Sequence, residues 1–150
     1  MSRKFAIGLI VALAVSAASL LAANPNWNRG PSVVVSVSAG TITVTGKATG
    51  LGNVPEVDFV LTGDIVVDSR CYTKKGNTPQ AANKQSHIEV DAPFSVAVNN
   101  GQTTLNQVIT FDADLVDCPG GQEARIEDAT YSLTLSASGF PQLTATFSSN

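Results

Sequence analysis

Residues 56–72, EVDFVLTGDIVVDSRCY, decide the fold class, because apolar side chains occupy alternate positions along most of this stretch. Alternation with a period of two is typical of a half-buried β-strand, whose successive side chains point to opposite faces of a sheet. Gly63 interrupts the apolar series, so we expect a bend or a β-bulge there. The apolar face consists of Phe59, Leu61, Gly63, Ile65, Val67 and Cys71, and the polar face includes Asp58, Thr62, Asp64, Asp68 and Arg70.

The same two-residue period continues on both sides of this stretch. Upstream, residues 32–38 place Val33, Val35 and Val37 on one face and Ser32, Ser36 and Ser38 on the other. Residues 41–45 alternate threonine with apolar residues, and Ala39-Gly40 between the two stretches indicates a hairpin turn. Beyond the N-terminal segment, no ten consecutive residues have a helical period. We therefore predict an all-β chain of seven to nine strands, an antiparallel β-sandwich that is Ig-like in general form, with a closed small barrel as the alternative. The pattern recurs downstream in residues 87–98, 103–115, 126–137 and 140–149.

Residues 1–23 have the order of a secretory signal peptide. Two basic residues give a cationic start, an apolar run follows over residues 5–15, and small residues are frequent before Ala23. This order is typical of a segment that is removed on export, and we expect cleavage after Ala22 or Ala23. A membrane anchor is the alternative, but serines weaken the second half of the apolar run and no basic cluster follows it.

We expect the rest of the chain to form a flexible leader (24–31) and one β-sandwich domain (32–150). Cleavage would remove Arg3 and Lys4 but no acid, so the formal net charge would change from −3 to −5. That acidity argues against nucleic acid or an anionic membrane surface as the main partner. We expect a secreted, extracellular protein without a stable membrane anchor, retained at the cell surface only through non-covalent contacts.

The chain has two cysteines, and in an exported protein two cysteines predict one disulfide, Cys71–Cys118. The bond would close a loop of about 48 residues. By reducing the entropy of the unfolded chain, it would stabilise the fold by up to about 4 kcal/mol. It would also bring two charged segments together. Residues 69–85, SRCYTKKGNTPQAANKQ, carry four of the seven cations of the mature chain, and residues 111–119, FDADLVDCP, carry three aspartates. The cations are Arg70, Lys74, Lys75 and Lys84, and the acids are Asp112, Asp114 and Asp117.

These opposite charges have two interpretations. Within one molecule they would neutralise each other as surface pairs, and we expect this outcome. Between molecules the basic segment of one copy would meet the acidic segment of another, in head-to-tail contacts that do not close.

The aspartates are also the only metal ligands that the sequence suggests, and no other cofactor is expected. Three hard oxygen donors at this spacing would suit Ca²⁺, so Asp112, Asp114 and Asp117 are candidate calcium ligands. The residues that an EF-hand loop requires are missing, and a solvated strand end is the ordinary alternative.

Catalytic residues are scarce, and we expect no enzyme activity. The chain has one histidine, His87, and its neighbour Ser86 would point to the opposite face of a strand, so the two cannot form a nucleophile–base pair. One histidine and a paired disulfide cannot supply a transition-metal site. The sequence has no metalloprotease, nucleophile-elbow or phosphate-loop motif.

The turns and cysteines, in the order GLGN (50–53), Cys71, GNTPQ (76–80), DCPGG (117–121) and IEDATYSLTL (126–135), resemble those of small secreted bacterial β-sandwich proteins with one disulfide. The resemblance spans residues 50–135. It implies export and an all-β fold, and it carries over no functional residue.

Two functions follow as hypotheses. The first is a structural protein of the cell surface or extracellular matrix that associates with itself, either through edge strands or by inserting its N-terminal strand, with Val33, Val35 and Val37, into a neighbour. The tight hairpin at Ala39-Gly40 favours pairing within the chain over such exchange. The second is a monomeric binding module that recognises a wall polymer, glycan or partner protein through residues 73–85.

Overall fold

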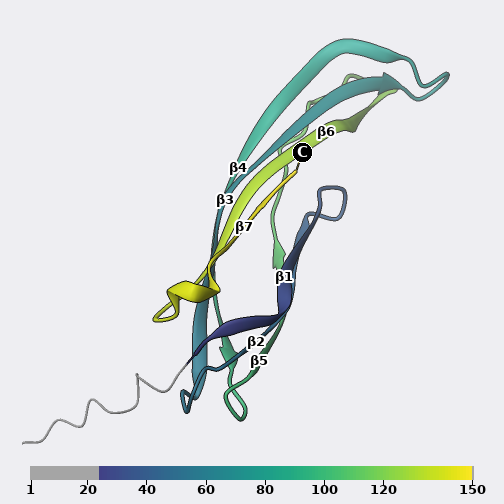
Figure 1. Cartoon of the computed structure of the whole chain (residues 1–150). Coiled ribbons are helices and arrows are strands. Elements are labelled where there is room, and N and C mark those ends of the chain that lie inside the picture. The colour runs from purple at the N-terminus through teal and green to yellow at the C-terminus, as the bar shows by residue number, and fades with distance from the viewer. Residues whose placement is uncertain (1–23, 150) are drawn as a thin grey trace, which may run out of the picture.

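The computed structural model describes residues 24–149, so the expected signal peptide lies outside the described residues (Figure 1). Within this range the chain forms seven antiparallel strands and one short 3₁₀ helix, which confirms the predicted all-β class. The same range contains no helix long and apolar enough to cross a membrane. The elements are β1 (Asn26–Ser36), β2 (Thr41–Thr49), β3 (Glu56–Thr73), β4 (Pro79–Ala97), β5 (Thr103–Thr110), β6 (Gln122–Ala137), η1 (Pro141–Leu143) and β7 (Ala145–Ser148).

The strands form two sheets rather than one closed sheet. A three-stranded sheet has the order β1-β2-β5, and a four-stranded sheet has the order β4-β3-β6-β7. Side chains from both sheets meet in one hydrophobic core, and the buried members of the three-stranded sheet include Ile42, Val44 and Leu105. The two sheets therefore bury their apolar faces against each other, as alternation along each strand requires.

The stretch that decided the fold class is the central strand of the larger sheet. β3 pairs with β4 on one side and with β6 on the other over nearly its whole length. Its odd-numbered side chains point into the core, as the sequence predicts, and the apolar ones are at most 1% exposed. They are Val57, Phe59, Leu61, Ile65, Val67 and Cys71.

Gly63 causes no bulge, in contrast to one of our two expectations. It pairs with Val90 and Leu133 in an unbroken register. Its φ is +139°, and a Cβ there would lie 2.0 Å from the carbonyl oxygen of Ser132. A glycine is needed because the backbone of β6 comes too close for any side chain.

The expected flexible leader is wrong for residues 26–31, because β1 begins at Asn26 rather than at Ser32. Asn26 and Trp27 pair with Thr49 and Ala48 of β2. The Trp27 ring lies 6.2 Å from that of Phe59, centroid to centroid, so the start of the strand is attached to the core. β1 follows β2 of its own chain along its length, with register shifts confined to residues 27–32.

The larger sheet extends beyond the smaller one. β3, β4 and β6 have 18, 19 and 16 residues, and their far halves continue past the three-stranded sheet in a curved projection (Figure 1). Residues 111–119, which we call the cover segment, run beside this projection after β5. They form no strand, although their apolar side chains still alternate: Phe111, Ala113 and Leu115 pack against the core, whereas Asp112 and Asp114 are exposed.

Candidate functional site

The predicted disulfide is present between Cys71 and Cys118, with 5.6 Å between their Cα atoms. It fastens the end of the cover segment to β3, where Cys71 is completely buried. A second attachment lies two residues earlier on β3: the Ser69 hydroxyl accepts a hydrogen bond of 2.9 Å from the Val116 amide and donates one of 3.3 Å to the carbonyl of Lys84. The cover segment is thus fixed to the projection through side chains, without strand pairing.

The basic segment is mostly strand rather than a binding loop. Of residues 73–85, only residues 74–78 form a turn, because β3 continues to Thr73 and β4 starts at Pro79. The four predicted cations consequently separate. Lys74 and Lys75 are exposed in the turn, Arg70 lies on the outer face of β3, and Lys84 lies on β4.

The disulfide brings the basic and acidic segments together, but only one ion pair joins them. The ammonium of Lys84 pairs with the Asp114 carboxylate across the gap between β4 and the cover segment. Arg70 instead pairs with Glu127 of β6, with 3.3 Å between Nε and Oε2. Both pairs lie within one molecule, and both are too exposed to add much stability.

The three aspartates do not form a calcium site. Within residues 24–149, no three acidic, histidine or cysteine side chains converge in a way that could hold a metal ion. β5 ends earlier than expected, so Asp112 and Asp114 project from an extended segment outside the strand. The Asp114 carboxylate already forms an ion pair with Lys84. The calcium prediction is therefore wrong, because alternation along an extended chain spaces the carboxylates instead of gathering them.

His87 is exposed on the outer face of β4, as predicted, and its Nε2 lies 3.2 Å from Oε1 of Gln85. Ser86 faces the other way, because it pairs with inward-pointing Val67. The arrangement gives the histidine no nucleophile to activate.

A polar cluster on the outer face of the projection surrounds Tyr72. The Tyr72 hydroxyl donates a 2.7 Å hydrogen bond to Oε1 of Glu127, and the guanidinium carbon of Arg125 lies 5.1 Å from the centre of the Tyr72 ring. The hydrogen bond to the Glu127 carboxylate raises the pKa of Tyr72 above its usual value of 10.0. Arg125 is further engaged by Glu123 and by Asn77. Every charge in this cluster has a partner, so it offers little to a ligand.

Four of the seven cations in residues 24–149 form no ion pair within that range, and they fall into two pairs. Lys74 and Lys75 are adjacent at the tip of the projection. Arg29 and Lys47 lie directly opposite each other on β1 and β2, in the three-stranded sheet. Like charges in direct cross-strand register destabilise a sheet, so the second pair is the less expected of the two.

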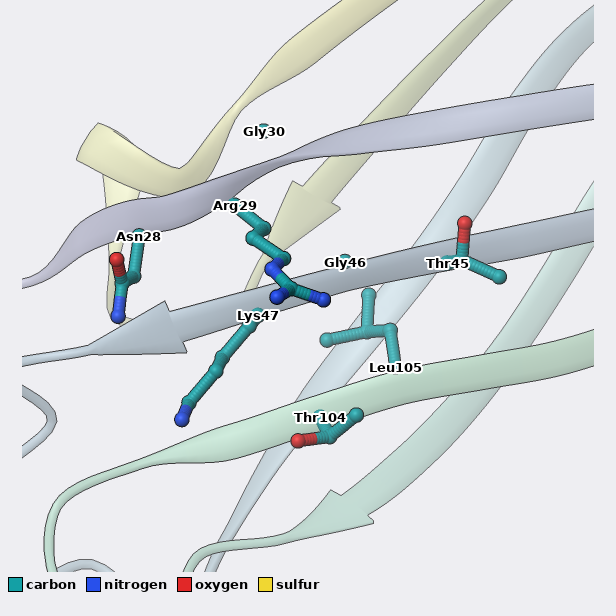
Figure 2. Close-up of a pocket in the computed structure, with 8 residues that line it drawn as sticks. All are labelled: Asn28, Arg29, Gly30, Thr45, Gly46, Lys47, Thr104 and Leu105. Carbon is teal, nitrogen blue, oxygen red and sulfur yellow. The ribbon is translucent and has the colours of Figure 1, made fainter.

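Arg29 and Lys47 line a depression of about 580 Å³ (Figure 2). In Figure 2 the Arg29 side chain reaches from β1 over β2, and Lys47 extends from β2 toward β5. The irregular section of β1 opens the surface here, because β1 and β2 lose and regain register between Trp27 and Ser32. The complete lining is Asn28, Arg29, Gly30, Thr45, Gly46, Lys47, Thr104 and Leu105.

Sequence reasoning missed this depression. Arg29 fell within the supposed leader, and Lys47 was an isolated cation in a threonine-rich strand. Only the cross-strand register brings them together, and that register depends on bulges that no local pattern shows. The one sequence feature that could have indicated their proximity was the hairpin turn at Ala39-Gly40, because it places the residues before and after it on neighbouring strands.

No family model, no curated protein and no solved structure matched this chain in the three comparisons. The geometry of the chain itself therefore carries the functional argument.

Proposed function

We propose that this protein is a secreted, non-enzymatic, Ig-like β-sandwich that acts as an extracellular structural protein by associating with copies of itself. The observation that carries the proposal is an uncharged sheet face beside an unprotected strand edge, both belonging to the three-stranded sheet. A disulfide in a chain with a signal-like N-terminus supports the extracellular setting.

The strand order supports the Ig-like description. In a constant-type Ig domain the first, second, fifth and fourth strands form one sheet, and the third, sixth and seventh form the other. Here the fourth strand has joined the second sheet, giving β1-β2-β5 against β4-β3-β6-β7. The disulfide differs, because it links β3 to the cover segment instead of joining the second and sixth strands.

The outer face of the three-stranded sheet is free of charge over its regular part. Val34, Thr43 and Val108 lie opposite one another in a row across the three strands. Val34 is 60% exposed and Val108 is 54% exposed, and they are the large apolar residues most open to solvent in the described range. We call this the neutral face; it consists of Ser32, Val34, Ser36, Thr41, Thr43, Thr45, Asn106, Val108 and Thr110.

Over residues 32–36, the free edge of β1 lacks the features that usually prevent edge pairing. Within residues 24–149, no strand pairs with its second side. Residues 32–36, SVVVS, contain no charge, proline or bulge. The edge of β4, by contrast, carries two prolines and several charges. Charge, proline and bulges are how natural sheets avoid association, so residues 32–36 form a stretch of edge that we expect to pair.

The second copy would add its own β1 to this edge, joining two three-stranded sheets into one of six strands. β1 is already in register with β2 of its own chain, which favours edge addition over the strand exchange considered from the sequence. Antiparallel pairing of β1 with β1 about a two-fold axis uses the same patch twice, so it gives a closed dimer.

The test is the mass of the oxidised mature chain, measured by analytical ultracentrifugation from micromolar to millimolar concentration. We expect concentration-dependent association that Val34→Lys abolishes, because a lysine puts charge on both the edge and the neutral face. Thr130→Lys is the matched control, since it adds the same charge to the exposed outer face of the other sheet. A monomer at every concentration, or equal effects of the two lysines, would reject the proposal.

The second candidate is a monomeric binding module that acts through the tip of the projection. It is favoured by Lys74 and Lys75, which are exposed at the β3–β4 turn and form no ion pair within the described range. A clean monomer that captures a wall polymer, and that loses it on Lys74→Gln/Lys75→Gln substitution, would favour this function over self-association.

A further inference from the structure

The Arg29–Lys47 pair lies at the irregular section of β1, and in the described part of the chain no ion pair neutralises its two like charges. The two residues are direct partners in the β1–β2 register and line the same depression, and neither forms an ion pair within residues 24–149. No acidic residue lines the depression that they share. In a chain whose acids outnumber its cations, two adjacent cations without an acid form a local site for an anion.

We propose that this depression binds a sugar unit that carries a carboxylate or a sulfate ester. The guanidinium of Arg29 presents paired N–H donors that match two oxygens of such a group, and Lys47 adds a second positive charge. The depression adjoins the neutral face on the same sheet and shares Thr45 with it, but the proposal does not depend on self-association.

The rest of the lining favours a sugar over a bare anion. Asn28, Thr45 and Thr104 contribute amide and hydroxyl groups, which can exchange hydrogen bonds with sugar hydroxyls. Gly30 leaves backbone atoms of the lining accessible, because an added Cβ there would meet nothing within 4 Å. A volume of about 580 Å³ lies within the range of small-molecule sites.

The same lining predicts how the ligand binds. No aromatic side chain lines the depression, so stacking contributes nothing. Binding must rest on charge and hydrogen bonds in a site open to water, which makes it weak and sensitive to salt. The negative charge of the whole chain further favours a sparsely charged glycan over a dense polyanion such as nucleic acid.

The test is an NMR titration of the ¹⁵N-labelled mature chain, at a concentration at which ultracentrifugation finds it monomeric. The probes are galacturonic acid oligomers, a sulfated galactose disaccharide, the neutral galactose disaccharide, and sodium acetate and sulfate at matched ionic strength. We expect both acidic sugars to shift the amide signals of Thr45, Gly46 and Thr104 and the Nε–H signal of Arg29. The neutral sugar should leave them in place.

The decisive comparison is between two double variants with the same change in charge. Arg29→Gln/Lys47→Gln should weaken binding of the acidic sugars at least about tenfold, since each hydrogen bond to a charged group that it removes is worth more than one factor of ten. Lys74→Gln/Lys75→Gln removes the other cation pair that forms no ion pair and should leave affinity unchanged. Unfolding midpoints of both variants check that the fold is intact.

Three results would overturn the inference. Equal losses in the two double variants would mean that net charge alone attracts the sugars. Acetate or sulfate binding as tightly as the sugars would mean that the site takes any anion. Unchanged signals at Thr45, Gly46 and Thr104 with both acidic sugars would mean that no such site exists. A preference between the two acidic sugars would identify the acid group.

Discussion

At the scale of single residues, the fold depends on one glycine whose role is to have no side chain. Gly63 lies in the middle of the longest regular pairing, with φ at +139° and the carbonyl of Ser132 where a Cβ would be. The obstructing atoms belong to the backbone of β6, so no rotamer change can relieve the contact.

Substitution of this glycine should therefore be costly. We expect Gly63→Ala to lower the free energy of unfolding by about 3 kcal/mol or more, from overpacking added to an unfavourable φ. Urea denaturation of the oxidised chain measures the effect. Gly120→Ala, where a Cβ meets nothing within 4 Å and no positive φ is imposed, should change stability by only a small fraction of that amount. Equal effects at the two positions would show that β6 does not approach as described.

The contribution of the Tyr72–Glu127 contact to folding stability should depend on pH. Because the hydrogen bond to Glu127 raises the pKa of Tyr72 in the folded state, this contact favours folding below pH 10. The unfolded chain ionises first as the pH rises, so the contribution is lost between the ordinary pKa and the raised one.

Absorbance at the tyrosinate band, in a Tyr131→Phe background that leaves one tyrosine, reports the titration of Tyr72 directly. We expect its midpoint to lie above 10.0 and to fall toward that value in Glu127→Gln. Asp128→Asn, which removes a neighbouring charge without a contact to Tyr72, should have little effect. Equal shifts in the two variants would assign the raised pKa to general negative charge.

At the scale of elements, the cover segment is the least conventional part of the molecule. It has no ladder of backbone hydrogen bonds, and Cys118, Ser69 and Lys84 attach it to the projection. Its inner side chains protect the far half of the larger sheet, which the three-stranded sheet does not reach (Figure 1).

Loss of the disulfide should accordingly affect the projection more than the sandwich. We expect Cys71→Ala/Cys118→Ala to lower the free energy of unfolding by up to about 4 kcal/mol. Hydrogen exchange should rise first at residues 66–72 and 122–129, while amides of β2 stay protected, since their burial does not depend on the cover segment. Uniform loss of protection across both sheets would contradict this division.

The strands and their faces could be predicted because the signal is local. The alternation of Phe59 and Ile65 with neighbouring polar residues predicts that both side chains point into the core. Asp112 and Asp114 were also placed on one exposed side correctly, but the end of β5 at Thr110 was not foreseen, because the sequence does not show where a pairing partner runs out.

The candidate site could not be predicted for the same reason. Arg29 and Lys47 meet only through the register of β1 against β2, and two irregularities between Trp27 and Ser32 set that register. A shift of one residue would turn either side chain to the other face. The early start of β1 was missed as well, because its anchor is a contact between Trp27 and Phe59, far apart in sequence.

At the scale of the whole molecule, the cations of residues 24–149 that form ion pairs lie in a different region from those that do not. The cations with partners lie along the projection, where Lys84, Arg70 and Arg125 each face an acid. The pairs without an ion-pair partner in residues 24–149 lie apart from each other: Lys74 and Lys75 at the tip, Arg29 and Lys47 on the smaller sheet. Between the latter pair and the end of β1 lies the neutral face. The proposed anion site and the proposed self-association face thus adjoin each other on the smaller sheet, away from the projection.

The position of the disulfide has a mechanical consequence when the chain is pulled from its two ends. Cys71 and Cys118 are 47 positions apart, and the covalent link carries tension directly across that interval. The residues between them, including the whole of β4 and β5, can be pulled out of the sheets but cannot lengthen the tether. About 160 Å of chain is thereby withheld from stretching, and reduction of the disulfide would release it.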